Sequence, residues 1–489
     1  MPSPAVTPPA SREALRIHPD WHYHFLGIGG IGMSALAAVL RERGVRVSGS
    51  DTQPGPALER LAADGIPVTV GHTAAALEGA DAVVYTSAVR PTHPIWAEVQ
   101  RRGLPRLHRA QLLGALAAER RTLAVTGTHG KTTCTAALAH ALAAADWQPT
   151  ALVGGHVPQW DGRNYRIGGG PWLVCEADES DGTFVHLAPE AVLLTNVEED
   201  HLDFHGTLDN LRAAFRAFLG RIRPGGCLVY CGEDPAAVAL ARGFEGRKLS
   251  YGFAASADVR VAVNGLTREG TQLTLTGPPG FTGPPGFTGP PGAPGLPGPA
   301  GGERLSSPLV GRHNALNLCG VYALARAVGL PPARLLAGLA DFRGVARRQQ
   351  YVGRVAGLSI YDDYAHHPTE IRATLECFLA IHDGPVSVVF QPHLYSRTAR
   401  FAAEFAEALR PAARVYVTDV YAAREAPLEG VSGRLIVERL AGHPAAAFLP
   451  DWHALSGRVR AGELPPGVLL TLGAGDITGL GAYLLRELA

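Results

Sequence analysis

Residues 122–145 carry the feature that most constrains the fold of this chain, a glycine-rich loop between a short apolar run and an alanine-rich run. Thr122–Thr126 predicts a β-strand, and Cys134–Ala145 predicts a helix. The loop between them reads Gly127, Thr128, His129, Gly130, Lys131, Thr132 and Thr133. A strand, a glycine loop and a helix N-terminus in this order typically hold phosphate groups on backbone N–H groups. A complete GxxxxGK motif would need glycine at 125, where Val125 stands.

Lys131 is one of only two lysines in the chain, the other being Lys248, although lysine and arginine together number 44. A compact ammonium group and a planar guanidinium are not equivalent at a phosphate. We therefore expect Lys131 to reach the β- and γ-phosphates of a nucleotide and the Thr132 hydroxyl to bind Mg²⁺. The alternative is an ordinary turn that contains glycine, which the flanking strand and helix disfavour.

The length of 489 residues indicates about three domains. Acidic and basic residues balance at 44 each, so the charge does not point to nucleic acid or to an anionic membrane as a partner. Residues 1–20 are proline-rich and polar, which predicts a disordered tail and not a signal peptide. Six scattered cysteines favour reduced thiols over a zinc site. With no apolar run long enough to span a bilayer, we expect a soluble cytoplasmic protein.

Residues 21–107 predict a small parallel α/β domain. A strand at 21–26 leads into Gly27, Gly29 and Gly32, which fit a G-x-G-x-x-G loop, and a second strand ends near Asp51. Taken alone, this pattern predicts a bound NAD, but any nucleotide diphosphate would suit the same helix N-terminus. The pattern does not decide between them.

The central domain, residues 108–342, places acidic groups after apolar strands. The strand at 172–175 is followed by Glu176, Asp178, Glu179 and Asp181. Four carboxylates so close together would repel one another without a cation, which predicts a metal near this strand end. The strand at 191–195 leads to His201, which would bind a second Mg²⁺ or orient a carboxylate. The alternatives are a solvated acidic loop and a structural histidine.

Between residues 256 and 276 the pattern changes to alternating strands, which predicts an antiparallel hairpin. From 277 to 301 glycine recurs at every third position, a collagen-like composition. A triple helix would require three chains to meet, so we expect a dispensable, low-complexity surface loop. A helix follows from about 311 to 328, in which Asn314 and Asn317 share a face. Their amides would suit an adenine edge or would cap the helix.

Residues 343–489 predict a third domain in which strands at 358–361, 386–390, 414–418 and 469–472 each lead into a polar cluster. The carboxyl ends of parallel strands line the ligand crevice in α/β domains. The fold class is therefore α/β with three domains: a Rossmann-like N-terminal domain, a P-loop-type central domain with a mostly parallel sheet, and a Rossmann-like C-terminal domain. A cleft shared by all three is the economical arrangement.

In order and spacing, nine motifs resemble those of the Mur ligases, the ATP-dependent amide-forming enzymes of peptidoglycan synthesis. They are GIGGIGMSALA, GTHGKTT, EADESDGTF, NVEEDHLDFHG, GRHNALN, GVARR, DDYAHHPTE, FQPHLYSRT and LGAGDI. The resemblance covers residues 21–489 apart from the collagen-like insert. It is greatest to the branch that adds L-alanine to UDP-N-acetylmuramate. No lysine lies between 132 and 247, so the carbamylated lysine of several sibling ligases is absent, as that branch implies.

The resemblance implies that the first domain holds the UDP-sugar, the central one ATP and Mg²⁺, and that the third closes with L-alanine. The implied UDP-sugar contacts are Gly29, Gly30, Ile31, Gly32, Asp51 and Ser87, with His366 and Arg397 also facing substrate. The implied ATP contacts are the loop 127–133, His313, Asn314, Asn317 and Arg348, with Asp363 completing the site. The implied metal ligands are Thr132, Glu176 and His201. The implied catalytic residues are Lys131, His201, Arg348, Asp363 and His366.

The implied chemistry has two steps. The muramoyl carboxylate attacks the γ-phosphate of ATP to give an acyl phosphate, and the amine of L-alanine then displaces phosphate. His201 or His366 would take the proton of the amine. The segment from Tyr421 to Glu425 departs from the family pattern, which tends to have glycine before the glutamate, so no role is assigned there.

Three alternatives remain open. One is a nicotinamide oxidoreductase that uses the glycine loop at 27–32. Another is a recycling ligase that attaches a whole peptide to the same UDP-sugar. The third is a nonenzymatic scaffold that forms a trimer through the collagen-like loop. For the ligase we expect a monomer or a weak homodimer.

Overall fold

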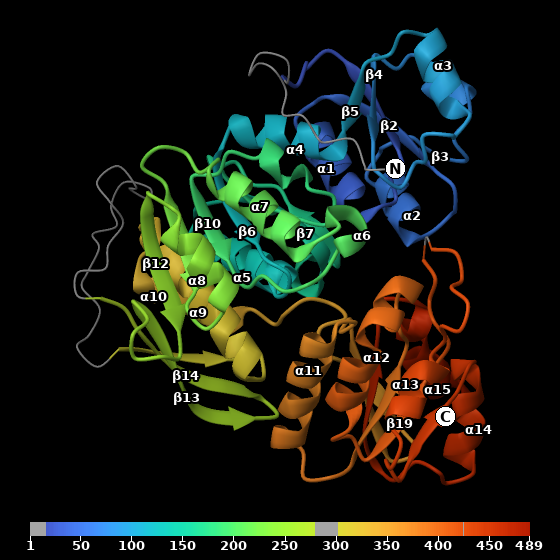
Figure 1. The fold of residues 1–489 in the computed structure, drawn as a ribbon. Helices are drawn as coiled ribbons and strands as arrows, with labels where there is room; N and C mark the ends of the chain where they lie inside the picture. Colours follow the sequence, from blue (N-terminus) through green and yellow to red (C-terminus); the bar gives the residue numbers. More distant parts are fainter. Residues whose placement is uncertain (1–15, 279–301, 424) are drawn as a thin grey trace. The chain divides into compact units, whose positions relative to one another are not determined.

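The computed structural model describes residues 16–278, 302–423 and 425–489, which form two compact units (Figure 1). The first unit contains residues up to 262, together with 274–305 and 316–342. The second contains 263–273, 306–315 and 343–489. The predicted tail lies almost wholly outside the described residues. Among the described residues, no helix combines the length and the apolar character needed to cross a bilayer.

The first unit begins with a five-stranded parallel sheet, as predicted. Its order is β3 (Val68–Val70), β2 (Arg46–Asp51), β1 (His22–Leu26), β4 (Ala82–Tyr85) and β5 (Arg106–His108). Helices α1 (Ile31–Glu42), α2 (Pro56–Ala63) and α3 (Ile95–Arg101) connect these strands. From β1 the chain adds β2 and then β3 on one side of the sheet. It then crosses back and places β4 on the other side of β1. The crevice at the carboxyl ends of β1 and β4 is therefore a topological switch point, where such sheets bind ligands.

The second sheet of this unit has ten strands, in the order β15-β14-β13-β12-β11-β10-β6-β9-β7-β8. Pairing is parallel from β13 to β7, and β8 pairs antiparallel at the edge. The strands on one side are β6 (Arg121–Thr126), β9 (Trp172–Glu176), β7 (Thr150–Val157) and β8 (Arg163–Arg166). On the other side lie β10 (Ala191–Leu194), β11 (Cys227–Cys231), β12 (Arg247–Gly252), β13 (Val259–Thr267), β14 (Gly270–Thr276) and β15 (Glu303–Ser307).

Helices cover this large sheet because its central strands are apolar on both faces. They are α4 (Arg109–Ala118), α5 (Lys131–Ala144), α6 (Leu202–His205), α7 (Leu208–Leu219), α8 (Pro235–Arg242), α9 (Arg312–Ala327) and α10 (Pro332–Asp341). The alanine-rich α5 packs closely against α10. A Cβ built on Gly338 of α10 would lie only 2.7 Å from the Cα of Ala141 in α5. Small residues at this crossing let the two backbones approach each other, and the contact fixes the position of α5. Helix α5 begins within the glycine-rich loop 127–133, called the phosphate loop below.

The second unit contains a six-stranded sheet. Its order is β16 (Gln350–Val355), β17 (Leu358–Asp363), β21 (Gly467–Leu472), β18 (Val386–Phe390), β19 (Arg414–Val417) and β20 (Ala446–Phe448). Only β16 pairs antiparallel among these strands. Its helices are α11 (Pro368–Ile381), α12 (Tyr395–Leu409), α13 (Arg434–Arg439), α14 (Leu455–Arg460) and α15 (Leu480–Glu487). The carboxyl ends of β17 and β18 carry the polar motifs that the sequence placed there.

The predicted hairpin is present as β13 and β14, and its tip belongs to the second unit. The Arg268 guanidinium donates a hydrogen bond to the Ile381 carbonyl (2.9 Å), which explains why the tip groups with residues 343–489. The second unit otherwise begins at Arg343, where the sequence places the third domain. β14 and β15 are neighbours in the sheet and flank the collagen-like segment, which lies outside the described residues over 279–301.

We expect the collagen-like segment to be dispensable. Replacing residues 279–300 with a four-residue Gly-Ser linker should keep activity within about twofold and thermal stability within about 1 kcal/mol, because loop-closure entropy changes slowly with length. Enzyme assays and thermal unfolding measure both quantities. A trimer in the parent chain that becomes a monomer in the shortened chain, seen by light scattering, would instead support the scaffold alternative.

Candidate active site

Two glycines fix the phosphate loop between β6 and α5. Gly127 has φ +129°, and a Cβ there would lie 2.2 Å from the Thr195 hydroxyl oxygen. Gly130 has φ +82° and is the N-cap of α5, where a Cβ would lie 2.7 Å from the Asn317 side-chain oxygen. A side chain at either position would combine backbone strain with a steric clash. The loop is therefore a defined structure at the start of α5, as the sequence predicts.

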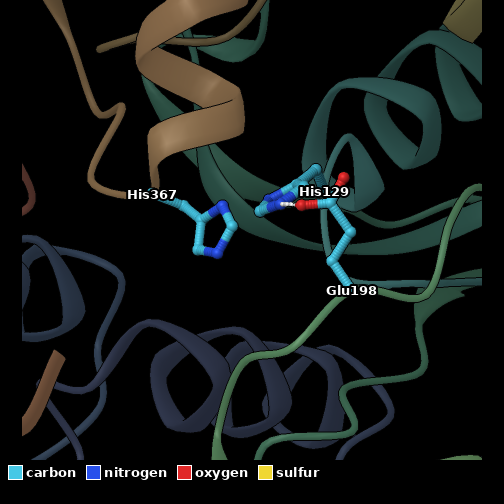
Figure 2. A group of neighbouring side chains, drawn as sticks. All are labelled: His129, Glu198 and His367. Atoms are coloured by element: carbon cyan, nitrogen blue, oxygen red, sulfur yellow. Dashed lines mark hydrogen bonds and ion pairs between the residues drawn. The ribbon is translucent and has the colours of Figure 1, made fainter. Parts of the chain in front are cut away.

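The residues that follow β10 brace this loop. The backbone N–H of His129 donates to the Asn196 side-chain oxygen (2.8 Å), and that of Thr128 donates to the Asn196 carbonyl (3.0 Å). The Thr195 hydroxyl donates to the carbonyl of His129 (2.6 Å). Figure 2 shows the His129 ring beside Glu198, with 3.3 Å between its Nε2 and the carboxylate. The third side chain drawn there, His367, belongs to the second unit, where its ring accepts from the N–H of Thr369 (3.4 Å).

Lys131 folds back along the loop. Its ammonium donates to the carbonyls of Gly127 (2.6 Å) and Thr128 (3.2 Å) and to both oxygens of Glu179 (2.8 and 2.9 Å). Glu179 is 1% exposed. Burial lowers the pKa of Lys131, but Glu179 and Asp178 outweigh it, so the net shift of that pKa is upward. Lys131 is therefore a fixed positive charge at the loop.

Thr132 and Glu176 meet beside this charge. The Thr132 hydroxyl donates to the Glu176 carboxylate (3.3 Å), whose other oxygen accepts from the N–H of Gly154. Burial raises the pKa of Glu176. Burial also acts to raise the pKa of Asp178, but Lys131, Arg109 and His201 reverse the shift and lower it. Of the predicted metal residues, Thr132 and Glu176 are in contact, and the Nε2 of His201 lies 3.7 Å from the Asp200 carboxylate.

The donor set fits a hard divalent cation. Four carboxylates, Glu176, Asp178, Glu179 and Asp181, lie here with two cations. Lys131 pairs with Glu179 (2.8 Å) and Arg109 with Asp181 (3.2 Å), which leaves negative charge in excess. Burial raises the pKa of Glu179 despite its ion pair with the Lys131 ammonium, and the Asp178 carboxylate adds to the rise. Carboxylate and hydroxyl oxygens are the ligands that Mg²⁺ prefers. The residues that would hold the ion are Thr132 and Glu176, with His201 close by.

A cavity of about 1060 Å³ lies between the glycine loop after β1 and the central sheet of the same unit. Among the residues that line it are Gly29, Gly30, Ile31, Gly32, Asp51, Glu176 and Asp178. The N–H of Gly29 donates to the Asp51 carboxylate (2.9 Å), which shapes the loop. Ser87 does not line the cavity. Its hydroxyl contacts the His108 ring (3.0 Å) and Asp181 (3.4 Å).

Helix α9 carries the three residues that the resemblance placed near adenine. Asn317 lies in the first unit, against Gly130 of the phosphate loop. His313 and Asn314 belong to the second unit. The Asn314 amide donates to the Val310 carbonyl (2.9 Å). Burial and the nearby Arg348 lower the pKa of His313 to about 4, so its ring is neutral.

In the second unit, one carboxylate links two of the predicted residues. Glu370 pairs with Arg348 (Nη1–Oε1, 3.4 Å) and with the His366 ring (Nδ1–Oε2, 3.2 Å), and it accepts from the His366 N–H (3.0 Å). Asp363 accepts from the N–H groups of Gln349 (2.8 Å) and Ala365 (2.9 Å). Burial raises the pKa of Asp363 to about 6, against the lowering effect of Arg348.

The same unit brings Arg397 to this group. Arg397 is 6% exposed on α12, and its Nη1 lies 3.4 Å from the Nδ1 of His393. The His393 ring faces the His366 ring edge-on at 5.8 Å and stacks on Tyr421. Arg348, Asp363, His366 and Arg397 thus form one cluster at the carboxyl ends of β17 and β18.

We expect Glu370→Ala to lower kcat about tenfold or more and to destabilise the second unit by roughly 1–3 kcal/mol, because it removes the carboxylate that pairs with Arg348 and accepts from the His366 N–H. Glu376→Ala, at an exposed position on the same helix, should change neither quantity. Steady-state kinetics and urea unfolding measure the two effects. Equal behaviour of the two variants would show that Glu370 does not position Arg348 and His366.

Three residues of the candidate site were given no individual role from the sequence, although their motifs were singled out. Glu179 is the partner of Lys131, Asn196 holds the phosphate loop, and Glu370 joins Arg348 to His366. Each lies within a motif after an apolar strand. Spacing alone does not tell which polar member of such a motif turns toward the site.

Known families match almost the whole chain. The model of the Mur ligase family catalytic domain matches residues 22–121, that of the Mur ligase middle domain 125–325, and that of the Mur ligase glutamate ligase domain 347–475. With its parallel sheets and its phosphate loop, the chain belongs to the Mur ligase family.

Its relatives include UDP-N-acetylmuramate–L-alanine ligases. The one from Mycolicibacterium vanbaalenii is 43% identical over 476 residues, which is 95% of each chain. The one from Kineococcus radiotolerans is 44% identical over 480 residues, 95% of this chain and 96% of the other. The crystal structure of the UDP-N-acetylmuramate-alanine ligase from Thermotoga maritima superposes with a TM-score of 0.77 at 29% identity, covering 96% of this chain and 99% of that one.

Proposed function

We propose that this chain joins L-alanine to the lactyl carboxylate of UDP-N-acetylmuramate, at the expense of ATP, in the synthesis of peptidoglycan precursors. The observation that carries the proposal is the Lys131 ammonium, fixed in a phosphate loop beside three carboxylates. Full-length similarity to L-alanine ligases supports the choice of acceptor.

The residues of the first unit would bind and orient the two anionic substrates. The backbone N–H groups at the start of α5 and the Lys131 ammonium would hold the phosphates of ATP. The glycine loop after β1 would hold the diphosphate of the UDP-sugar, since the same cavity reaches Glu176 and Asp178. Mg²⁺, held by Thr132 and Glu176 near His201, would supply charge neutralisation at the transferring phosphoryl group.

The second unit would complete the reaction. Its cluster around Glu370 offers Arg348 and Arg397 as fixed cations for phosphate or carboxylate groups. The attacking amine must lose a proton, and His366 or His201 would accept it. Domain closure would exclude water, which otherwise hydrolyses the acyl phosphate.

The choice of acceptor tests the proposal. The protein is incubated with ATP, Mg²⁺ and UDP-N-acetylmuramate, with L-alanine, glycine, L-serine or a tripeptide as the acceptor, and the UDP product is identified by mass spectrometry. We expect the L-alanyl product to form fastest, and no product when EDTA removes the metal. Faster ligation of the tripeptide would favour the recycling ligase. Tight NADH binding in a fluorescence titration, with no ligation, would favour the oxidoreductase.

A further inference from the structure

A continuous chain of histidines and serines runs from the surface of the five-stranded sheet to the cavity. On β1, His22 and His24 share one face of the sheet, and Ser48 and Ser50 lie beside them on β2. His72, which follows β3, lines the cavity. The fold uses the opposite face of β1, with Tyr23 and Phe25, for its core. The proposed chemistry gives these five polar residues no task.

Every link of the chain is a hydrogen bond. His22 Nε2 lies 2.8 Å from the Ser48 hydroxyl, which lies 2.9 Å from His24 Nδ1. His24 Nε2 lies 3.1 Å from the Ser50 hydroxyl, which lies 2.8 Å from His72 Nδ1. At the outer end, His22 Nδ1 lies 2.9 Å from the carbonyl oxygen of Gly79.

The Gly79 carbonyl can only accept, and this fixes the direction of the whole chain. His22 must carry its proton on Nδ1, so its Nε2, when the ring is neutral, accepts the Ser48 hydroxyl proton. Ser48 must then accept from His24 Nδ1–H, because each hydroxyl has one proton to donate. By the same count, Ser50 donates to His24 Nε2 and accepts from His72 Nδ1–H. The Nε2 of His72 is left with a lone pair.

We propose that this hydrogen-bonded chain makes the Nε2 of His72 a hydrogen-bond acceptor for the nucleoside of the UDP-sugar. The inference rests on the proposed function, which places a uridine nucleotide in the cavity. Ionised phosphates offer no donor, so the partner is the uracil imide N–H or a ribose hydroxyl.

Burial keeps the interior of the chain neutral. His24 is 1% exposed, and burial lowers its pKa to about 4. Burial also lowers the pKa of His72. The charged and titratable groups that face the chain are Asp81 and Arg46 at its outer end and Asp51 and His93 at its inner end.

The tautomers are measured directly on the wild-type protein. Imidazole ¹⁵N shifts of ¹⁵N-histidine-labelled protein, assigned with His22→Gln, His24→Gln and His72→Gln variants, are recorded at pH 8. We expect the Nδ1–H tautomer at all three rings, whereas free imidazole side chains favour Nε2–H. An Nε2–H signal from His72 at pH 8 would overturn the proposal.

The affinities of UDP analogues show whether His72 accepts from the uracil or from the ribose. Calorimetry compares UDP, N3-methyl-UDP, 2′-deoxy-UDP and 3′-deoxy-UDP on wild-type and His72→Ala protein. We expect one analogue to bind wild type about tenfold more weakly than UDP, the cost of one lost hydrogen bond, and this difference to vanish in His72→Ala. Loss with the N3-methyl analogue assigns the imide, and loss with a deoxy analogue assigns the corresponding ribose hydroxyl. Losses that persist in His72→Ala, or no loss at all, contradict the assignment.

Ser48→Ala cuts the hydrogen-bonded chain and tests its link to His72. At pH 8 this variant should bind UDP up to about tenfold more weakly than wild type, because His72 is no longer held in one tautomer. Ser359→Ala, a strand serine in the second unit outside the chain, should bind UDP as wild type does. Equal affinities of wild type and Ser48→Ala overturn the proposal. Absence of any UDP binding to wild type would instead refute the proposed function.

Discussion

Replacing Lys131 with alanine is expected to lower the rate of ATP-dependent phosphate release by about 10³-fold or more. The variant loses the ammonium that we propose binds the phosphates, and it leaves Glu179 without the cation that pairs with it. Binding of UDP-N-acetylmuramate should remain measurable, because the glycine loop after β1 is untouched. Phosphate release and calorimetry measure the two effects.

Lys248 provides the matched control, since it is the only other lysine in the chain. Its ammonium donates to the carbonyls of Ala241 (2.9 Å), in the last turn of α8, and Phe244 (3.0 Å), just after that helix. Lys248→Ala should therefore keep full turnover. Turnover by Lys131→Ala close to that of Lys248→Ala would show that Lys131 does not bind the triphosphate.

Gly127→Ala is expected to abolish ligation and to destabilise the first unit by about 3 kcal/mol or more. The new Cβ would lie 2.2 Å from the Thr195 hydroxyl oxygen and 2.7 Å from the Asn196 carbonyl, at a φ of +129°. Backbone strain and overpacking each cost about 1–3 kcal/mol. Relief of the clash must displace the Asn196 contacts that brace the loop. Urea unfolding and the ligation assay measure the outcome.

Gly44→Ala separates strain from the clash. Gly44 also has a positive φ (+81°), but a Cβ there meets no atom within 4 Å. We expect a cost of about 1–2 kcal/mol from the backbone alone, with turnover unchanged. Similar losses of activity in both variants would mean that the Thr195 contact does not define the loop.

The sequence predicts the buried strands well and the edge strands poorly. β6, β9, β10 and β18 stand where apolar runs predict them, because a strand buried on both faces needs such a run. β16 and β8 went unpredicted. Both lie at sheet edges and contain polar, partly exposed residues, so their strand conformation comes from pairing with a neighbour.

The candidate site also contains features that the sequence predicted and features that it did not. The glycines at 127 and 130 were predicted from the motif, and the structure gives each one a steric reason. The partner of Lys131 was not predicted, because four carboxylates follow β9 and the sequence does not single out one of them. A local turn, in which the N–H of Ser180 donates to Asp178 (3.1 Å), decides that Glu179 faces the ammonium. The histidine chain was missed as well, since its five members come from three separate segments of the sequence.

Transfer of isotope from the acceptor carboxylate tests the proposed chemistry most directly. UDP-N-acetylmuramate labelled with ¹⁸O in its lactyl carboxylate is incubated with the protein, ATP, Mg²⁺ and L-alanine, and the released phosphate is analysed by mass spectrometry. Activation of the carboxylate by the γ-phosphate predicts one ¹⁸O atom in each phosphate formed. Phosphate that carries no label, released while the L-alanyl product accumulates, would contradict the acyl-phosphate route.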